Sequence, residues 1–81
     1  MDARKLLRLP EVLNLTANKR STHYFRIKEG LMVPPIKLGE RSSAYPADEV
    51  TAIVSAHIAG DSLDQIRDLV AQLIKARNEA V

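Results

Sequence analysis

The chain has no cysteine and few aromatic residues, and these shortages narrow both its fold and its chemistry. Without cysteine, disulfide bridges, thiolate zinc sites and a cysteine nucleophile are excluded. Its two histidines are too few for a histidine-built metal cage. Because only two tyrosines and one phenylalanine are aromatic, the core must consist mainly of Leu, Ile, Val and Ala. That composition is typical of a helical fold.

Long apolar runs are also missing, and no catalytic motif stands out. The basic residues Arg4, Lys5 and Arg8 are not followed by a continuous apolar segment, so the sequence predicts neither a secretory signal nor a membrane span. We therefore expect a soluble cytoplasmic protein with no membrane partner. No acid–base pair, glycine-rich phosphate loop or Ser/His/Asp set is recognisable. The sequence thus predicts no enzyme activity and no cofactor.

Charge is divided unevenly along the 81 residues, a length that suits one small domain. Residues 1–41 carry nine Lys and Arg against four Asp and Glu, a formal charge of +5. Residues 42–81 carry three against six, a formal charge of −3. A polyanion would bind the basic part, although uneven charge also occurs on ordinary solvated surfaces.

The first half of the chain predicts two short helices joined by a tight turn. Residues 9–13 suit a helix, because Pro10 fits its first turn and Glu11 its positive end. A polar stretch at residues 16–19 then interrupts the apolar pattern, and Asn18 is the candidate there for the cap or for a left-handed conformation. Residues 20–28 continue without Gly or Pro, which predicts the second helix.

A small hairpin is predicted next. Gly30 can end the second helix in a left-handed conformation, and the proline pair at 34–35 forbids further helix. Residues 36–38 alternate apolar and polar side chains as a half-buried strand does. Residues 43–45 predict the return strand, and the loop at 39–43 gives the hairpin a basic tip.

Two longer helices complete the prediction. Pro46 opens the third and Gly60 ends it. Ser62 and Gln65 have the spacing of a capping box at the start of the fourth. The predicted apolar stripes are Val50, Ile53, Val54, His57 and Ile58 on the third helix and Leu63, Ile66, Val70, Leu73 and Ile74 on the fourth.

Several short motifs make the chain similar to a known family. They are RLPEVLNLT at residues 8–16, Arg20-Ser21-Thr22 with Tyr24 two positions further, Ile27-Lys28-Glu29-Gly30, and Pro35-Ile36-Lys37-Leu38-Gly39 with Arg41. Over roughly residues 6–58 the chain resembles the AlpA family of small phage and prophage regulators, which is related to excisionases and to the MerR-like winged helix.

The resemblance implies a fold and a function. The expected fold is mainly α with a small β-hairpin wing, a winged helix-turn-helix with an additional C-terminal amphipathic helix. The expected function is sequence-specific binding of double-stranded DNA to regulate integrase or phage genes, and some family members promote prophage excision. The chain departs from the family in three places: Ala17-Asn18-Lys19 replaces the usual Gly-Leu-Ser, Phe25-Arg26 replaces Arg-Leu, and Tyr45 replaces a tryptophan.

The second helix supplies most of the candidate DNA contacts. Its period places His23 and Ile27 on one side and Ser21, Phe25 and Lys28 on the other. An exposed Phe can contact a thymine methyl group, and hydroxyl and basic side chains reach bases and phosphates. The base-side candidates are Ser21, Thr22 and Phe25, with Tyr24 of the matching motif; the phosphate candidates are Lys19, Arg20, Arg26 and Lys28. Alternatively, Phe25 packs under the wing or in a dimer contact.

Other residues carry weaker predictions. Lys37, Arg41 and Ser42 of the hairpin are candidates for the adjacent minor groove or its backbone, unless they are simply solvated. Arg26 alternatively pairs with Glu29 or Glu40. The histidines, His23 and His57, are predicted to lie at the boundary of the core.

The C-terminal helix leaves the domain organisation open. Residues 1–60 are predicted to form the DNA-binding domain. Residues 61–81 would then fold back onto it, pair with a second protomer, or bind a partner such as an integrase. We expect a homodimer or a cooperative array on DNA. The rival hypothesis is a protein-interaction module, an adaptor or antitoxin-like protein that works through this helix.

Overall fold

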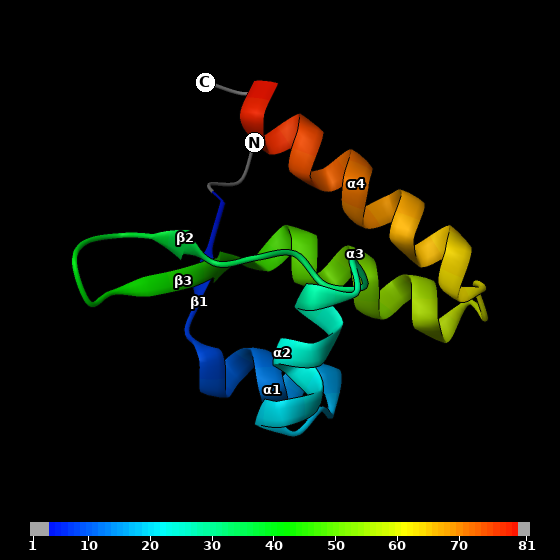
Figure 1. The fold of residues 1–81 in the computed structure, drawn as a ribbon, viewed down its shortest axis with the longest axis horizontal. Helices are drawn as coiled ribbons and strands as arrows, with labels where there is room; N and C mark the ends of the chain where they lie inside the picture. Colours follow the sequence, from blue (N-terminus) through cyan, green and yellow to red (C-terminus); the bar gives the residue numbers. More distant parts are fainter. Residues whose placement is uncertain (1–3, 80–81) are drawn as a thin grey trace.

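A computed structural model describes residues 4–79, so the predicted limits at residues 1 and 81 lie outside the described residues. Helices dominate, and a small antiparallel sheet lies beside them (Figure 1). The fold is the predicted one: a winged helix-turn-helix with an added C-terminal helix. Its elements are β1 (Leu6–Leu7), α1 (Leu9–Thr16), α2 (Arg20–Lys28), β2 (Ile36–Lys37), β3 (Ser43–Pro46), α3 (Ala47–Ile58) and α4 (Leu63–Glu79).

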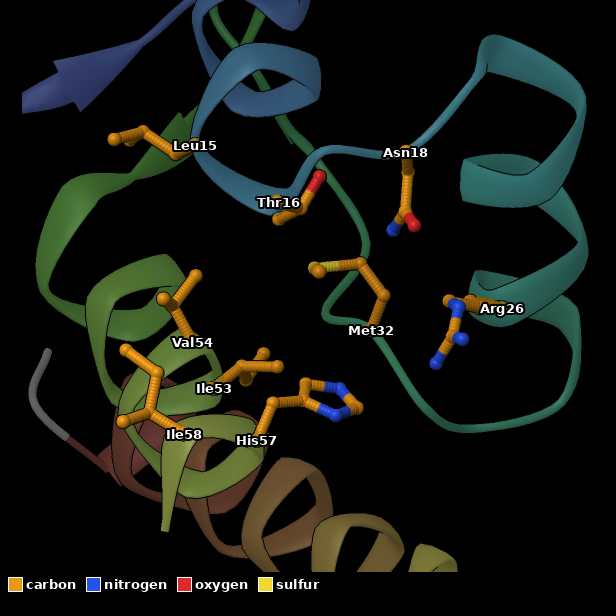
Figure 2. Close-up of a pocket in the computed structure, with 9 residues that line it drawn as sticks. All are labelled: Leu15, Thr16, Asn18, Arg26, Met32, Ile53, Val54, His57 and Ile58. Atoms are coloured by element: carbon orange, nitrogen blue, oxygen red, sulfur yellow. The ribbon is translucent and has the colours of Figure 1, made fainter. Parts of the chain in front are cut away.

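The tight turn between α1 and α2 is built differently from the prediction. Ala17, not Asn18, adopts the left-handed conformation, with φ of 58°. The Ala17 N–H donates to the carbonyl of Asn14 at 3.4 Å and so closes the end of α1. Asn18 instead turns its amide into a hollow beside α2 (Figure 2). Lys19 then takes the N-cap position without a side-chain capping bond.

The sheet has one strand more than the sequence predicts. Its order is β1-β3-β2, and both pairings are antiparallel. β1 pairs Leu6 with Pro46 and Leu7 with Tyr45. A strand of two residues has no measurable alternation, which is why it escapes sequence analysis. The hairpin itself follows the prediction, except that Leu38 lies outside β2 and Pro46 extends β3.

The buried face of α3 is rotated from the predicted stripe. Val50 and Ile53 are buried as expected, but Glu49 and Ala56 complete the face. The predictions for His57 and Ile58 are wrong, since His57 is exposed and Ile58 is 82% exposed. The reason is that α1 and α4 both pack on α3. The part of α3 that faces these two helices is therefore the part that is buried.

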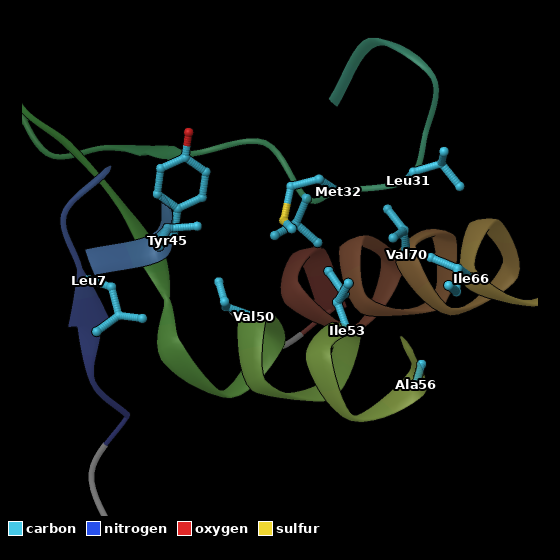
Figure 3. Packing of buried hydrophobic residues seen from close by; sticks show 11 residues of the cluster. Leu7, Leu31, Met32, Tyr45, Val50, Ile53, Ala56, Ile66 and Val70 are labelled. Carbon is cyan, nitrogen blue, oxygen red and sulfur yellow. The ribbon is translucent and has the colours of Figure 1, made fainter. Parts of the chain in front are cut away.

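α4 contributes to the same core. Ser62 and Gln65 form the predicted capping box: the Ser62 N–H donates to Gln65 Oε1 at 2.8 Å, and the Gln65 N–H donates to Ser62 Oγ at 3.2 Å. Ile66 and Val70 are buried against α3 and the segment at residues 31–33 (Figure 3). Leu63, predicted in the stripe, is 52% exposed because it lies one turn before the contact begins.

A buried ion pair holds the far end of α4. Glu49 is only 3% exposed, and its carboxylate accepts hydrogen bonds from both Arg77 and Arg4. Arg77 also donates to the carbonyl of Pro34 at 3.2 Å. The contacts therefore join α3, α4 and the segment before β2. The local sequence around Glu49 gives no sign of this burial, because Arg77 and Arg4 are distant along the chain.

Candidate nucleic-acid interface

α2 presents one face to solvent, which we call the outer face: Ser21, Tyr24, Phe25 and Lys28. All four residues are exposed, and the Phe25 side chain is 59% exposed. On the opposite side His23 is fully buried and Ile27 packs against the core. The alternative that Phe25 packs under the wing therefore does not hold within this chain.

The outer face is not covered by α4. In Figure 1, α4 lies on one side of α3, whereas α1 and α2 lie on the other. The contact between α4 and the end of α2 comes from Arg67, whose Nε donates to the carbonyl of Glu29 at 3.1 Å. α2 is thus packed along its inner side and open along its outer side.

His23 ties α2 to the wing. Its Nε2 and the hydroxyl of Tyr45 in β3 share a buried hydrogen bond of 2.8 Å, and the two rings meet edge to face at 5.2 Å. Burial, with a smaller contribution from Arg20, lowers the pKa of His23, because the imidazolium is poorly solvated there. Burial also raises the pKa of Tyr45. Sequence analysis placed His23 at the core boundary, but the structure makes it a central contact between helix and wing.

Arg8, just before α1, supports the wing from its other side. Its Nη1 donates to Ser42 Oγ at 3.3 Å and to the carbonyl of Ser43 at 3.2 Å. The hydroxyl of Ser42, a predicted DNA contact, is therefore engaged within the protein. Lys37 and Arg41 are exposed on the hairpin. Sequence reasoning missed the role of Arg8, although its place in the basic opening was a usable signal.

Cations dominate the exposed surface of the first half of the chain. Arg4 is bound to Asp48 at 3.0 Å, which lowers the pKa of that carboxyl. The other exposed cations form no salt bridge within residues 4–79. They are Lys5, Arg8, Lys19, Arg20, Lys28, Lys37 and Arg41.

The start of α2 adds to this positive surface. No side chain caps the first turn, so its backbone N–H groups are available to an external acceptor. The exposed Lys19 and Arg20 lie at the same end of the helix. A helix N-terminus flanked by cations favours a phosphate group.

Two predicted contact residues lie away from the outer face. Thr22 is half-buried on the flank of α2. Arg26 lies on the same flank one turn later and directs its guanidinium into the hollow shown in Figure 2. The predicted salt bridge from Arg26 to Glu29 or Glu40 is wrong, because Arg26 pairs with no carboxylate in residues 4–79.

The fold and this surface define a class: a winged helix-turn-helix with an open second helix and several exposed cations. Comparison with known proteins agrees. The chain belongs to the family of the prophage CP4-57 regulatory protein (AlpA), whose model matches residues 5–57. It is therefore a member of a phage-associated family of transcriptional regulators.

One relative is the uncharacterized protein ORF88 of Enterobacteria phage P4. The two are 41% identical over 56 residues, which cover 69% of this chain. The match spans 64% of the phage protein, so the chain covers slightly less than two thirds of that relative. No solved structure shows significant similarity. Within residues 4–79, no helix combines the length and apolar character that crossing a bilayer requires.

Proposed function

We propose that the protein binds double-stranded DNA, with α2 in the major groove and the wing on the flanking backbone, and thereby regulates phage or prophage genes. The observation that carries this proposal is the outer face of α2, where an exposed Phe25 lies beside Lys28 on a helix held rigidly by the His23–Tyr45 contact. An α-helix fits the major groove of B-DNA.

We assign the base contacts to the middle of the outer face. Phe25 can contact a thymine methyl group, while the hydroxyls of Ser21 and Tyr24 can reach base edges or phosphates. Thr22 is less accessible but lies close to the start of the helix. Arg26 has no place in this proposal, because its guanidinium is directed into the hollow.

We assign the phosphate contacts to the two ends of α2 and to the hairpin. Lys19, Arg20 and the free N–H groups of α2 lie at one end of the helix, and Lys28 lies at the other. On the hairpin, Lys37 and Arg41 extend the positive surface toward the next stretch of backbone or its minor groove. Ser42 contributes by holding Arg8 in place.

The experiment is fluorescence anisotropy with the DNA upstream of the protein's own gene and with a scrambled duplex. Lys28→Gln and Arg41→Gln should each weaken binding to both duplexes about three- to tenfold, since phosphate contacts are sequence-independent. Lys75→Gln, an exposed cation on α4, is the matched control and should change nothing. Equal losses in all three variants would reject the proposed orientation.

Control of recombination is the finer part of the proposal. A protein that occupies repeated sites as a homodimer or a cooperative array, and bends the DNA between them, can favour integrase-mediated excision without catalysing a step. Purified protein added to the integrase of the same element should raise the yield of excised circle in proportion to site occupancy. An unchanged yield at saturating occupancy would limit the function to transcription.

The rival hypothesis, a protein-interaction module based on the C-terminal helix, has less structural support. The apolar residues Ile66 and Val70 of α4 are buried in the core and are not free to dock a partner. Leu63 is the large apolar side chain that α4 leaves exposed within the described residues. DNA binding relies instead on residues that are open to solvent.

A further inference from the structure

A hollow of about 340 Å³ lies between α2 and α3 and is separate from the outer face. The end of α1, the turn before α2 and the C-terminal half of α3 form its walls (Figure 2). Its volume falls at the lower end of the range typical of small-molecule sites, roughly 300–1,000 Å³. Nothing in the proposed DNA contacts uses it.

One side of the hollow is polar. Arg26 from α2, Asn18 from the turn and His57 from α3 line it and point toward one another across the gap (Figure 2). Within the described residues, neither Nε nor Nη1 of Arg26 has a hydrogen-bond partner, although both atoms are buried. A guanidinium only donates and stays protonated, so buried, unpaired N–H groups call for an acceptor.

The lining residues indicate the charge of that acceptor. None of the lining residues, all of which belong to the described part of the chain, carries a carboxylate. The positive charge of Arg26 is therefore not neutralised locally. An arginine fork binds a carboxylate through two parallel hydrogen bonds, and Asn18 and His57 can donate to the same group.

Most of the remaining lining is apolar, and its most buried members are Met32 and Ile53. Leu15, Val54 and Ile58 form the wall toward solvent, and Ile58 is 82% exposed. These side chains would cover the hydrocarbon part of a ligand whose charged end reaches Arg26. An inorganic anion would leave them uncovered, so the lining favours an organic acid.

We propose that this hollow is a binding site for a small organic carboxylate with an aliphatic or aromatic body. Its anionic end would pair with Arg26, and its body would lie against Val54 and Ile58. Such a ligand would join the helix-turn-helix to α3 and so restrain α2. The proposal concerns the free protein and does not depend on DNA binding.

The test is a titration of ¹⁵N-labelled full-length protein with 3-phenylpropionate and octanoate, followed by NMR. We expect saturable shifts centred on Asn18, Arg26 and His57, and a rise in melting temperature with ligand concentration. The uncharged 3-phenylpropanamide should bind at least about tenfold more weakly, because it lacks the charge that pairs with the guanidinium. Equal binding of acid and amide, or no saturable shift up to millimolar concentration, would overturn the proposal.

Variants test the role of Arg26 directly. Arg26→Gln should weaken the binding of 3-phenylpropionate about tenfold or more. Arg26→Lys keeps the charge but loses the planar fork, so its affinity should lie between those of the wild type and Arg26→Gln. Lys75→Gln removes an exposed cation from α4, outside both the hollow and the proposed DNA contacts, and should bind like the wild type. If Arg26→Gln does not fold, the Lys variant and the wild-type acid–amide comparison still decide the matter.

Two other occupants are distinguished by the same spectra. If the signals of the hollow shift with protein concentration and not with acid, a second copy of the chain fills it, and the proposal is rejected. If a phosphate buffer competes as well as 3-phenylpropionate does, the site recognises charge alone and the inferred apolar part is wrong.

Discussion

At the scale of single residues, the orientation of α2 depends on a buried polar contact. His23 is fully buried, and its Nε2 meets the Tyr45 hydroxyl at 2.8 Å. A polar residue in a core stabilises the fold only when its hydrogen bonds are made, and losing one partner leaves the other buried and unpaired. The same contact that places Phe25 outward therefore also makes the domain sensitive to acid.

Protonation of His23 should lower stability as the pH falls below about 6.5. The pKa of His23 is lower in the folded protein than its ordinary value of about 6.5. Above that value both states are neutral, and the contribution to stability is complete. As pH falls below it, the unfolded chain takes up a proton first and stability is lost, until the folded-state pKa is passed.

Urea unfolding at pH 7.5 and pH 5 measures this loss. The decrease should be smaller in His23→Gln, whatever the absolute stability of that variant. His57→Gln is the matched control, because His57 is exposed, and it should retain the wild-type decrease. An identical pH dependence in all three proteins would show that His23 is not the group responsible.

Phe25 should matter for DNA and not for folding. Because its ring is 59% exposed, Phe25→Ala removes little packing, and the melting temperature should stay within about 2 °C. Loss of an apolar base contact should weaken binding to the specific duplex roughly five- to tenfold in an anisotropy assay. Leu63→Ala removes a similarly exposed apolar side chain from α4 and should leave affinity unchanged. Unaltered affinity in a folded Phe25→Ala variant would remove this residue from the interface.

At the scale of elements, α4 is held to the domain by apolar packing and by a buried ion pair, besides the Arg67 hydrogen bond to Glu29. Ile66 and Val70, in the first half of α4, pack against α3. The Arg77–Glu49 pair binds the C-terminal end of α4. A buried carboxylate that loses its partner costs far more than an exposed pair does. The two contacts should therefore contribute in different ways to stability.

Removing Arg77 should expose this difference. Arg77→Met leaves Glu49 buried with only Arg4 nearby, and we expect a loss of about 2–4 kcal/mol in the free energy of unfolding. Arg67→Met, which breaks an exposed pair with Asp64 and a hydrogen bond to the carbonyl of Glu29, should cost only about 1 kcal/mol. Chemical denaturation of the two variants gives the comparison, and similar losses would contradict a special role for Glu49.

Ile66 tests the packing of α4. Its side chain is fully buried, so Ile66→Ala should lower the free energy of unfolding by about 2–5 kcal/mol through lost burial and an incompletely filled cavity. Leu69→Ala, a partly buried neighbour on the same helix, should cost less. If Ile66→Ala were as stable as the wild type, α4 would not be part of the folded core in solution.

At the scale of the whole molecule, charge is separated between its parts. The cations of residues 1–41 are mostly exposed and free of salt bridges within residues 4–79, whereas the later cations Arg67 and Arg77 pair with carboxylates. The exposed cations of the first half of the chain thus suit a polyanion. In the proposed DNA complex, this separation would orient the molecule before any base is read.

Salt should therefore weaken DNA binding steeply. If Lys19, Arg20, Lys28, Lys37 and Arg41 each neutralise a phosphate, the plot of log affinity against log salt should have a slope of roughly −4 to −5. Lys37→Gln should reduce the magnitude by about 1, and Lys75→Gln should not change it. A flat plot would exclude the proposed backbone contacts.

Patterns along the chain predicted the helices, the hairpin and the open face of α2, because each depends on local periodicity, Gly and Pro positions, or capping residues. Gly30 and Gly60, for example, have φ of 76° and 83° as their helix-ending positions require. The failures share a different cause. β1 is too short for a pattern, and the buried face of α3 depends on which helices cover it. The predicted Arg26 salt bridge is absent from residues 4–79, because the neighbours of Arg26 across the hollow come from the turn and α3.

The sequence by itself determined the order of elements and the distribution of charge, since both follow from neighbouring residues and simple counts. Only the tertiary structure decided that His23 meets Tyr45, that Glu49 is buried with Arg77, and that Arg26 faces a hollow. Each of these contacts joins residues at least 22 positions apart, or surrounds one side chain with several elements. Residues so far apart along the chain come into contact only when the whole chain packs.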